Sequence, residues 1–190
     1  MRLFHFSDDP GIALFSPRPV RVPSSRPAGR DWLNGPLVWA IDETHAMLYL
    51  FPRDCPRIVV WPVATTSPDE RAQWFGDQPW RAIAHVERDW LERLRTATLY
   101  RYDLPVAAFA PLGDVGMWVA RAAVAPLRVE AIRDLPAALE AGGVALRVME
   151  TLTPLAEVWN TSLHASGLRL RNARDWVQPS PGSNMPTRAR

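Results

Sequence analysis

The chain has 190 residues, a formal net charge of +2 and 22 basic residues, every one of which is arginine. Because lysine is absent, the sequence excludes enzymes that need it, such as Schiff-base aldolases, pyridoxal-phosphate enzymes, P-loop nucleotide hydrolases and protein kinases. The single cysteine, Cys55, excludes an intrachain disulfide and a multi-cysteine metal centre.

Charge and apolar content also set expectations for location and partners. The low net charge argues against nucleic acid as a partner, and no apolar run is long enough to predict a membrane span. The N-terminal segment lacks the apolar core of a signal peptide, so we expect a cytoplasmic protein. The length predicts one globular domain over residues 1–177, followed by a disordered tail over residues 178–190, where Pro, Ser, Gly and Arg dominate.

The first elements alternate between strands and helices. Residues 3–6 predict a short strand, and residues 8–36 predict a long loop because proline and glycine recur throughout them. Loops of this length are usually functional or disordered. The apolar run over residues 37–41 predicts a buried strand, and Asp42 fits the N-cap of a helix that ends near Phe51.

The middle of the chain predicts a turn, a strand and two helices. The turn spans residues 52–57 and the strand spans residues 58–61. Ser67 followed by Pro68 is a strong helix start. Residues 81–95 predict a longer helix, because apolar side chains recur there at spacings of three and four.

The second half of the chain is richer in predicted strands. These cover residues 99–102, 117–120, 127–132 and 144–148, and a short helix precedes the last of them. A final helix is expected from Thr153 to about Gly167. Strand–helix alternation followed by a cluster of strands predicts an α+β fold with a mixed or antiparallel sheet.

His5 and Ser7 are the first candidate site residues. They lie two positions apart on the first predicted strand, so both side chains are expected on one face of the sheet. A histidine beside a hydroxyl can hydrogen-bond the ribose or the amide of a ligand. The alternative is a structural histidine at a strand edge.

The turn over residues 52–57 holds the densest polar cluster. Arg53 and Arg57 flank Asp54 between two prolines, and two guanidinium groups suit the recognition of a phosphate. The alternative is an internal arginine–aspartate network that braces the turn. Cys55 is either a nucleophile activated by the arginines or a small buried residue.

The remaining candidates are aromatic or histidine residues. Most of the nine tryptophans fall in apolar runs and are expected in the core, whereas Trp39 is kept as a candidate because of its predicted strand. The histidines show no ligand spacing, so no metal site is expected.

The motifs over residues 1–12, 37–41 and 52–57 resemble a bacterial family of uncharacterised proteins of this length. The resemblance covers residues 1 to about 176. The family is a domain of unknown function, so the resemblance implies no activity.

A second resemblance is to the ADP-ribosyltransferase-like fold, which includes the RNA 2′-phosphotransferases. It implies that His5 and Ser7 bind the ribose and amide of NAD, and that Trp39 stacks on the nicotinamide in place of the usual tyrosine. The third motif of that fold normally carries a glutamate, which the strand over residues 117–120 lacks. That absence puts mono-ADP-ribosyl transfer in doubt.

Together these observations predict an α+β domain with a split, mixed or antiparallel β-sheet core, flanking helices and an ADP-ribosyltransferase-like fold. The expected ligand is NAD or a related small-molecule nucleotide, without metal or membrane. His5 is the expected catalytic residue. The expected binding residues are His5, Ser7, Trp39, Arg53 and Arg57. The alternative is a non-catalytic binding or interaction module, and the oligomeric state is left open.

Overall fold

The computed structural model describes residues 1–23 and 26–177 of the chain. These residues divide into two compact units, each assembled from two separate stretches of sequence. Unit 1 contains residues 1–46 and 99–131, and unit 2 contains residues 47–98 and 132–177. The expected tail over residues 178–190 lies outside the described residues, and a single domain over residues 1–177 stays a prediction.

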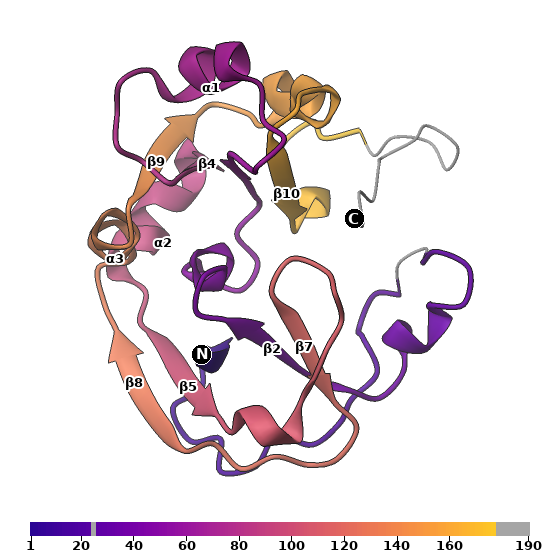
Figure 1. Ribbon diagram of the computed structural model, residues 1–190. Coiled ribbons are helices and arrows are strands. Elements are labelled where there is room, and N and C mark those ends of the chain that lie inside the picture. The colour runs from indigo at the N-terminus through magenta and orange to yellow at the C-terminus, as the bar shows by residue number, and fades with distance from the viewer. Residues whose placement is uncertain (24–25, 178–190) are drawn as a thin grey trace. The chain divides into compact units, whose positions relative to one another are not determined.

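Unit 1 is built on a six-stranded antiparallel sheet with the strand order β6-β7-β2-β1-β5-β8. Strand β1 is central because it pairs with β2 on one side and with β5 on the other. Figure 1 shows β2 beside β7 and β5 beside β8. The strands are β1 (Leu3–Ser7), β2 (Val38–Asp42), β5 (Leu99–Leu104), β6 (Ala110–Pro111), β7 (Met117–Ala120) and β8 (Arg128–Ile132).

The two faces of this sheet carry different side chains. Directly paired residues share a face, so His5 and its partner Tyr102 lie on the same face. Phe15 covers that face, with its ring 5.2 Å from the ring of Tyr102. The opposite face carries Trp39 and its partner Val119.

Within the predicted loop, the described residues 8–23 and 26–36 hold no strand and one short 3-10 helix, η1 (Asp31–Asn34), and this part of the chain is tied to the sheet. Phe15 pairs with Val124, and Arg18 pairs with Leu37, each through an isolated antiparallel bridge. The loop therefore packs against unit 1 at several points.

Unit 2 is built on a four-stranded mixed sheet with the strand order β10-β3-β4-β9. Its strands are β3 (Arg57–Trp61), β4 (Ala82–Glu87), β9 (Val144–Met149) and β10 (His164–Leu168). Every residue of β3 and β4 is buried. Strand β4 pairs antiparallel with β3 and parallel with β9, so it is covered at both edges as well as on both faces.

The described residues contain three α-helices, namely α1 (Pro68–Phe75), α2 (Leu91–Thr96) and α3 (Leu135–Ala141). The predicted start of α1 is confirmed, because the Ser67 hydroxyl accepts a hydrogen bond from the backbone N–H of Glu70 at 3.2 Å. The 3-10 helices are η1 (Asp31–Asn34), η2 (Ala46–Tyr49), η3 (Arg88–Trp90), η4 (Val106–Ala108), η5 (Thr153–Asn160) and η6 (Leu170–Asn172).

The long helix predicted over residues 81–95 is wrong. Residues 82–87 form the buried strand β4, and the helical part is confined to η3 and α2. The apolar residues expected on one helix face belong to three elements, β4, η3 and α2. A short apolar run that is buried on all sides has no periodicity that separates a strand from a helix.

Two other helix predictions shrink to 3-10 segments. The helix expected from Asp42 to Phe51 is reduced to η2. The last helix is reduced to η5, and residues 164–168 form the edge strand β10 instead. The chain enters β10 because its five residues pair with β3 along their full length.

The α+β class is confirmed, and the described residues form two sheets, of which one is antiparallel and the other mixed. The structure identifies no ADP-ribosyltransferase fold. Among the described residues, no helix combines the length and the apolar character needed to cross a membrane.

Candidate functional site

His5 is held in place by the neighbouring strand. Its Nδ1 lies 2.9 Å from the backbone carbonyl oxygen of Trp39, and its ring centroid lies 4.7 Å from that of Phe15. An imidazole bonded to a carbonyl through Nδ1 donates its proton there, which fixes the tautomer. His5 is therefore an oriented histidine packed under the loop.

Ser7 is buried, and its hydroxyl already has a partner. The Ser7 oxygen accepts the backbone N–H of Asp9 at 3.2 Å. Tyr102, on the same face, donates to the carbonyl of Asp9 at 2.6 Å and accepts the N–H of Ile12 at 3.2 Å. The backbone of the loop thus hydrogen-bonds with both hydroxyl groups on this face.

Trp39 lies on the other face of the sheet from His5 and Ser7. Its ring packs with Leu33, Leu37 and Val119, and the Arg26 guanidinium lies 6.0 Å from its centroid. Its buried indole N–H finds no acceptor among the described residues. The structure does not bring the Trp39 ring and the His5 side chain together, so one pocket on one face cannot use both.

Arg57 belongs to unit 2 and is buried. Its Nε and Nη2 donate to the carbonyl of Leu48 at 3.0 and 2.7 Å, and its Nη1 donates to the carbonyl of Cys55 at 3.0 Å. The guanidinium lies 5.0 Å from the ring centroid of Phe51. Burial lowers the pKa of Arg57 to about 10. These contacts favour the alternative in which Arg57 stabilises the turn from inside over the one in which it binds a phosphate.

The rest of the turn is also tied internally. The carbonyl of Arg53 accepts a hydrogen bond from Nε of Arg169 at 3.1 Å, and the carbonyl of Asp54 accepts one from the Asn172 amide at 2.8 Å. Cys55 is fully buried, and burial raises the pKa of its thiol to about 12. The thiol is therefore protonated at neutral pH, which favours the small buried residue over the nucleophile. The phosphate role of Arg53 stays a prediction.

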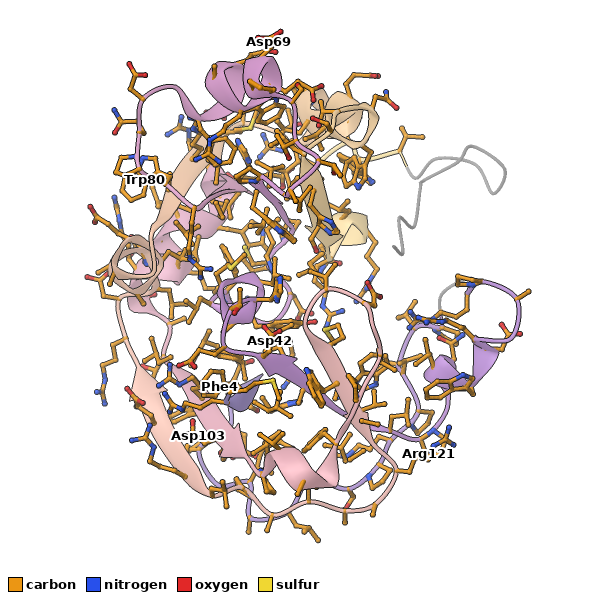
Figure 2. All side chains as sticks on the ribbon, viewed as in Figure 1. Phe4, Asp42, Asp69, Trp80, Asp103 and Arg121 are labelled. Carbon is orange, nitrogen blue, oxygen red and sulfur yellow. The ribbon has the colours of Figure 1, made fainter. Side chains whose placement is uncertain are left out.

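Unit 1 contains a cavity of about 600 Å³ that sequence reasoning missed. It lies between η1, the η4–β6 segment and the end of β7, and Arg121, which lines it, follows β7 directly (Figure 2). Its volume falls in the range of small-molecule sites. The larger side chains that line it come from Arg30, Trp32, Phe109, Leu112, Val119 and Arg121.

The polar groups of this cavity are positively charged. The Arg121 guanidinium lies 4.8 Å from the ring centroid of Trp32, and the Trp32 side chain is 40% exposed. Arg30 donates from Nη2 to the carbonyl of Leu112 at 3.3 Å. In the part of the chain that the structure describes, neither arginine pairs with a carboxylate. The cavity therefore offers an indole, an apolar floor and two arginine charges not neutralised by an acid.

Only part of this arrangement was visible in the sequence. Arg30 and Trp32 fall in the loop over residues 8–36, whose length alone marks it as functional or disordered. Arg121 comes about ninety residues later and reaches them because β7 pairs with β2. No local motif joins the two segments.

A second polar pair in unit 1 is formed by Asp42 and His45. The Asp42 carboxylate lies 2.8 Å from Nδ1 of His45 and accepts the backbone N–H of the same residue at 2.8 Å. Gly116 packs against both, with a φ of +67°, and a Cβ there would lie 2.4 Å from His45 Nδ1. The pair is thus fixed by a backbone that only glycine fits.

No cluster of three or more potential metal ligands occurs among residues 1–23 and 26–177.

The chain is an α+β protein with a positively charged, aromatic-lined cavity in one of its two units. Residues 4–173 match a family of unknown function, DUF6886, and the chain belongs to that family. Neither the curated proteins nor the solved structures gave a significant match.

Proposed function

We propose that unit 1 binds a nucleotide, NAD or a related molecule, in the cavity lined by Arg30, Trp32 and Arg121. The observation that carries this proposal is the Arg121 guanidinium stacked at 4.8 Å on a partly exposed indole at the cavity wall. A guanidinium binds phosphate oxygens in pairs, and an indole stacks on a base or a nicotinamide ring.

The two arginines divide the binding in this proposal. Arg121 takes the phosphate and thereby brings the attached ring toward Trp32. Arg30 is partly held by the Leu112 carbonyl and adds a second positive charge. Phe109 and Val119 supply an apolar surface for the ring or the sugar. In this proposal Arg121 supplies the phosphate contact and Trp32 the stacking contact, in place of Arg57 and Trp39, and the phosphate role of Arg53 stays a separate prediction.

The proposal favours binding over turnover. The backbone of residues 9–12 hydrogen-bonds with the hydroxyls of Ser7 and Tyr102, and β7 carries no acidic residue. A non-catalytic nucleotide-binding module fits these contacts. ADP-ribosyltransferase-like or phosphotransferase-like activity is the second candidate, and the oriented imidazole of His5 is the observation that favours it.

Calorimetric titration of the full chain with NAD, ADP and inorganic phosphate tests the proposal. We expect NAD and ADP to bind, and both Trp32→Ala and Arg121→Ala to weaken them about tenfold or more, because base stacking and charged hydrogen bonds are each worth on the order of 1–3 kcal/mol. Arg93→Ala is the matched control, since Arg93 also lies over an indole, that of Trp90 at 5.4 Å, away from this cavity.

The outcomes separate the two sites. Affinity lost in Trp32→Ala and kept in His5→Ala supports the cavity. Affinity lost in His5→Ala and kept in Trp32→Ala moves the site to the His5 face. If the folded protein gives no heat of binding with either NAD or ADP, the proposal is overturned.

A further inference from the structure

Strand β8 is an edge of the unit 1 sheet with an unusual surface. It is the last strand in the order β6-β7-β2-β1-β5-β8, and its first four residues are exposed. Val129 on the strand is 45% exposed, and Leu127 just before it is 72% exposed. An exposed edge with apolar side chains is a template for pairing with another strand.

The charges on β8 are arranged symmetrically about Val129. Arg128 precedes it and Glu130 follows it, and their side chains are 57% and 47% exposed. If a second copy of β8 lies antiparallel with the two Val129 residues opposite each other, each Arg128 faces Glu130 of the other copy. Directly opposite charges stabilise a strand pair, and like charges destabilise it.

The same charges select against the neighbouring registers. Centring the pair on Arg128 places two arginines against each other, and centring it on Glu130 places two glutamates against each other. The register centred on Val129 is the one in which both charged positions are matched and two apolar side chains meet at the centre.

The charged side chains are also held in place before any pairing. Glu130 lies 2.7 Å from Nη2 of Arg101, and Arg128 lies 3.3 Å from the Asp103 carboxylate. Figure 2 shows Asp103 beside Phe4 on the neighbouring strands. Because these contacts restrict the rotamers of Arg128 and Glu130, association costs less side-chain entropy.

We propose that β8 is a docking edge for a second copy of this chain, which pairs antiparallel with the two Val129 residues opposite each other. The pairing joins two six-stranded sheets through one short strand on each side. Such an interface is small, so the dimer is weak and depends on protein concentration. This inference is independent of the nucleotide proposal.

Charge reversal tests the pairing by sedimentation velocity on the full chain over a range of concentrations. We expect a monomer–dimer equilibrium for the natural sequence, and at least about tenfold weaker association for either Arg128→Glu or Glu130→Arg, because each replaces two attractive pairs by two repulsive ones. An equimolar mixture of the two variants is expected to associate again, since an acidic edge then meets a basic one. Arg71→Glu, on exposed helix α1, controls for net charge.

A cysteine cross-link tests the register. Val129→Cys is expected to form an intermolecular disulfide on mild oxidation, because the two residues face each other. Leu127→Cys is the matched control: its two copies are offset by four residues, about 13 Å along the strands, and a disulfide needs Cα atoms within about 7 Å. Cys55 is fully buried and does not interfere.

The results decide the proposal in both directions. A chain that stays monomeric at the highest concentration, or single variants that associate as tightly as the natural sequence, overturns it. Cross-linking of Leu127→Cys equal to that of Val129→Cys overturns the register. Rescue in the mixture supports the pairing even where one variant alone is less stable.

Discussion

The two units treat their charged residues in opposite ways. In unit 2, Arg57, His85 and Glu87 lie on the central strands and are buried. In unit 1, Arg30 and Arg121 line an open cavity without a carboxylate partner in the described part of the chain. The difference teaches that burial and several internal hydrogen bonds commit a charged residue to the fold, whereas an exposed arginine without a carboxylate partner keeps donors for a ligand.

Glu87 illustrates the internal use of charge in unit 2. Its carboxylate accepts the backbone N–H of Arg174 at 2.9 Å and that of Leu152 at 3.4 Å. A buried carboxylate bonded to backbone donors connects three segments of the chain. The charge therefore stabilises the fold and is not offered to a ligand.

The comparison is tested most strongly at Arg57. Arg57→Met leaves the carbonyls of Leu48 and Cys55 without donors, so we expect a loss of about 3 kcal/mol or more in the free energy of unfolding. Chemical denaturation measures it. Arg57→Lys keeps the positive charge but lacks the planar guanidinium with its several N–H donors, so its free energy of unfolding is expected to lie between those of Arg57→Met and the natural sequence. Full stability in Arg57→Met would contradict the role of a brace.

The pH dependence of stability tests the burial of His85. Burial lowers the pKa of His85 to about 4, against 6.5 for a free histidine. Above about pH 6.5 both states are neutral, and between pH 6.5 and 4 only the unfolded state binds the proton. We expect His85 to cost about 3 kcal/mol of stability as the pH falls through this window.

Denaturant unfolding at several pH values, compared with His85→Phe, isolates this contribution from other groups. The variant is expected to lose that part of the pH dependence. Equal pH profiles for the two proteins would show that His85 is not shielded from solvent.

Gly116→Ala tests, within unit 1, whether the Asp42–His45 pair depends on the glycine packed against it. A Cβ at this position would lie 2.4 Å from Nδ1 of His45 and 2.7 Å from the Asp42 carboxylate, on a backbone with a φ of +67°. We expect a loss of about 1–3 kcal/mol, read from thermal unfolding. Gly113→Ala is the control, since it shares a positive φ but has open space around its Cβ.

Arg121→Ala gives the smallest effect on stability. Its side chain contacts the Trp32 ring at an open cavity, so the free energy of unfolding is expected to change by less than about 0.5 kcal/mol. The contrast with Arg57→Met is the measurement of interest. A large loss of stability in Arg121→Ala would place Arg121 among the structural arginines.

Local signals predicted much of the fold. The strands over residues 3–6, 58–61 and 117–120 are confirmed because turn residues bound their apolar runs. The cap at Ser67 is confirmed because its bond joins residues three positions apart. The helices predicted over residues 81–95 and 153–167 are wrong at residues 82–87 and 164–168, because pairing with β3 and β9 decides the conformation there and partners distant in sequence leave no local pattern.

The candidate site was harder to predict than the fold. The placement of His5 and Ser7 on one face is confirmed, because the alternation of a strand is a local property. Trp39 stays a predicted site residue, but its ring lies on the opposite face of the sheet from His5, and the register between β1 and β2 that decides this cannot be read from either strand alone. Arg57 was an ambiguous candidate because its sequence fits a phosphate ligand and a brace equally well, and only its burial separates them.

The ties along the loop over residues 8–36 have a consequence for the kinetics of binding. The bridges at Phe15 and Arg18, and the bond from the Val20 N–H to the Asn34 carbonyl at 3.2 Å, hold the chain on both sides of Arg30 and Trp32. Much of the conformational entropy of this loop is therefore lost during folding and not when a ligand arrives. If the proposed nucleotide binds in the cavity, we therefore expect its rate of association to be set by diffusion and charge and not by ordering of the loop.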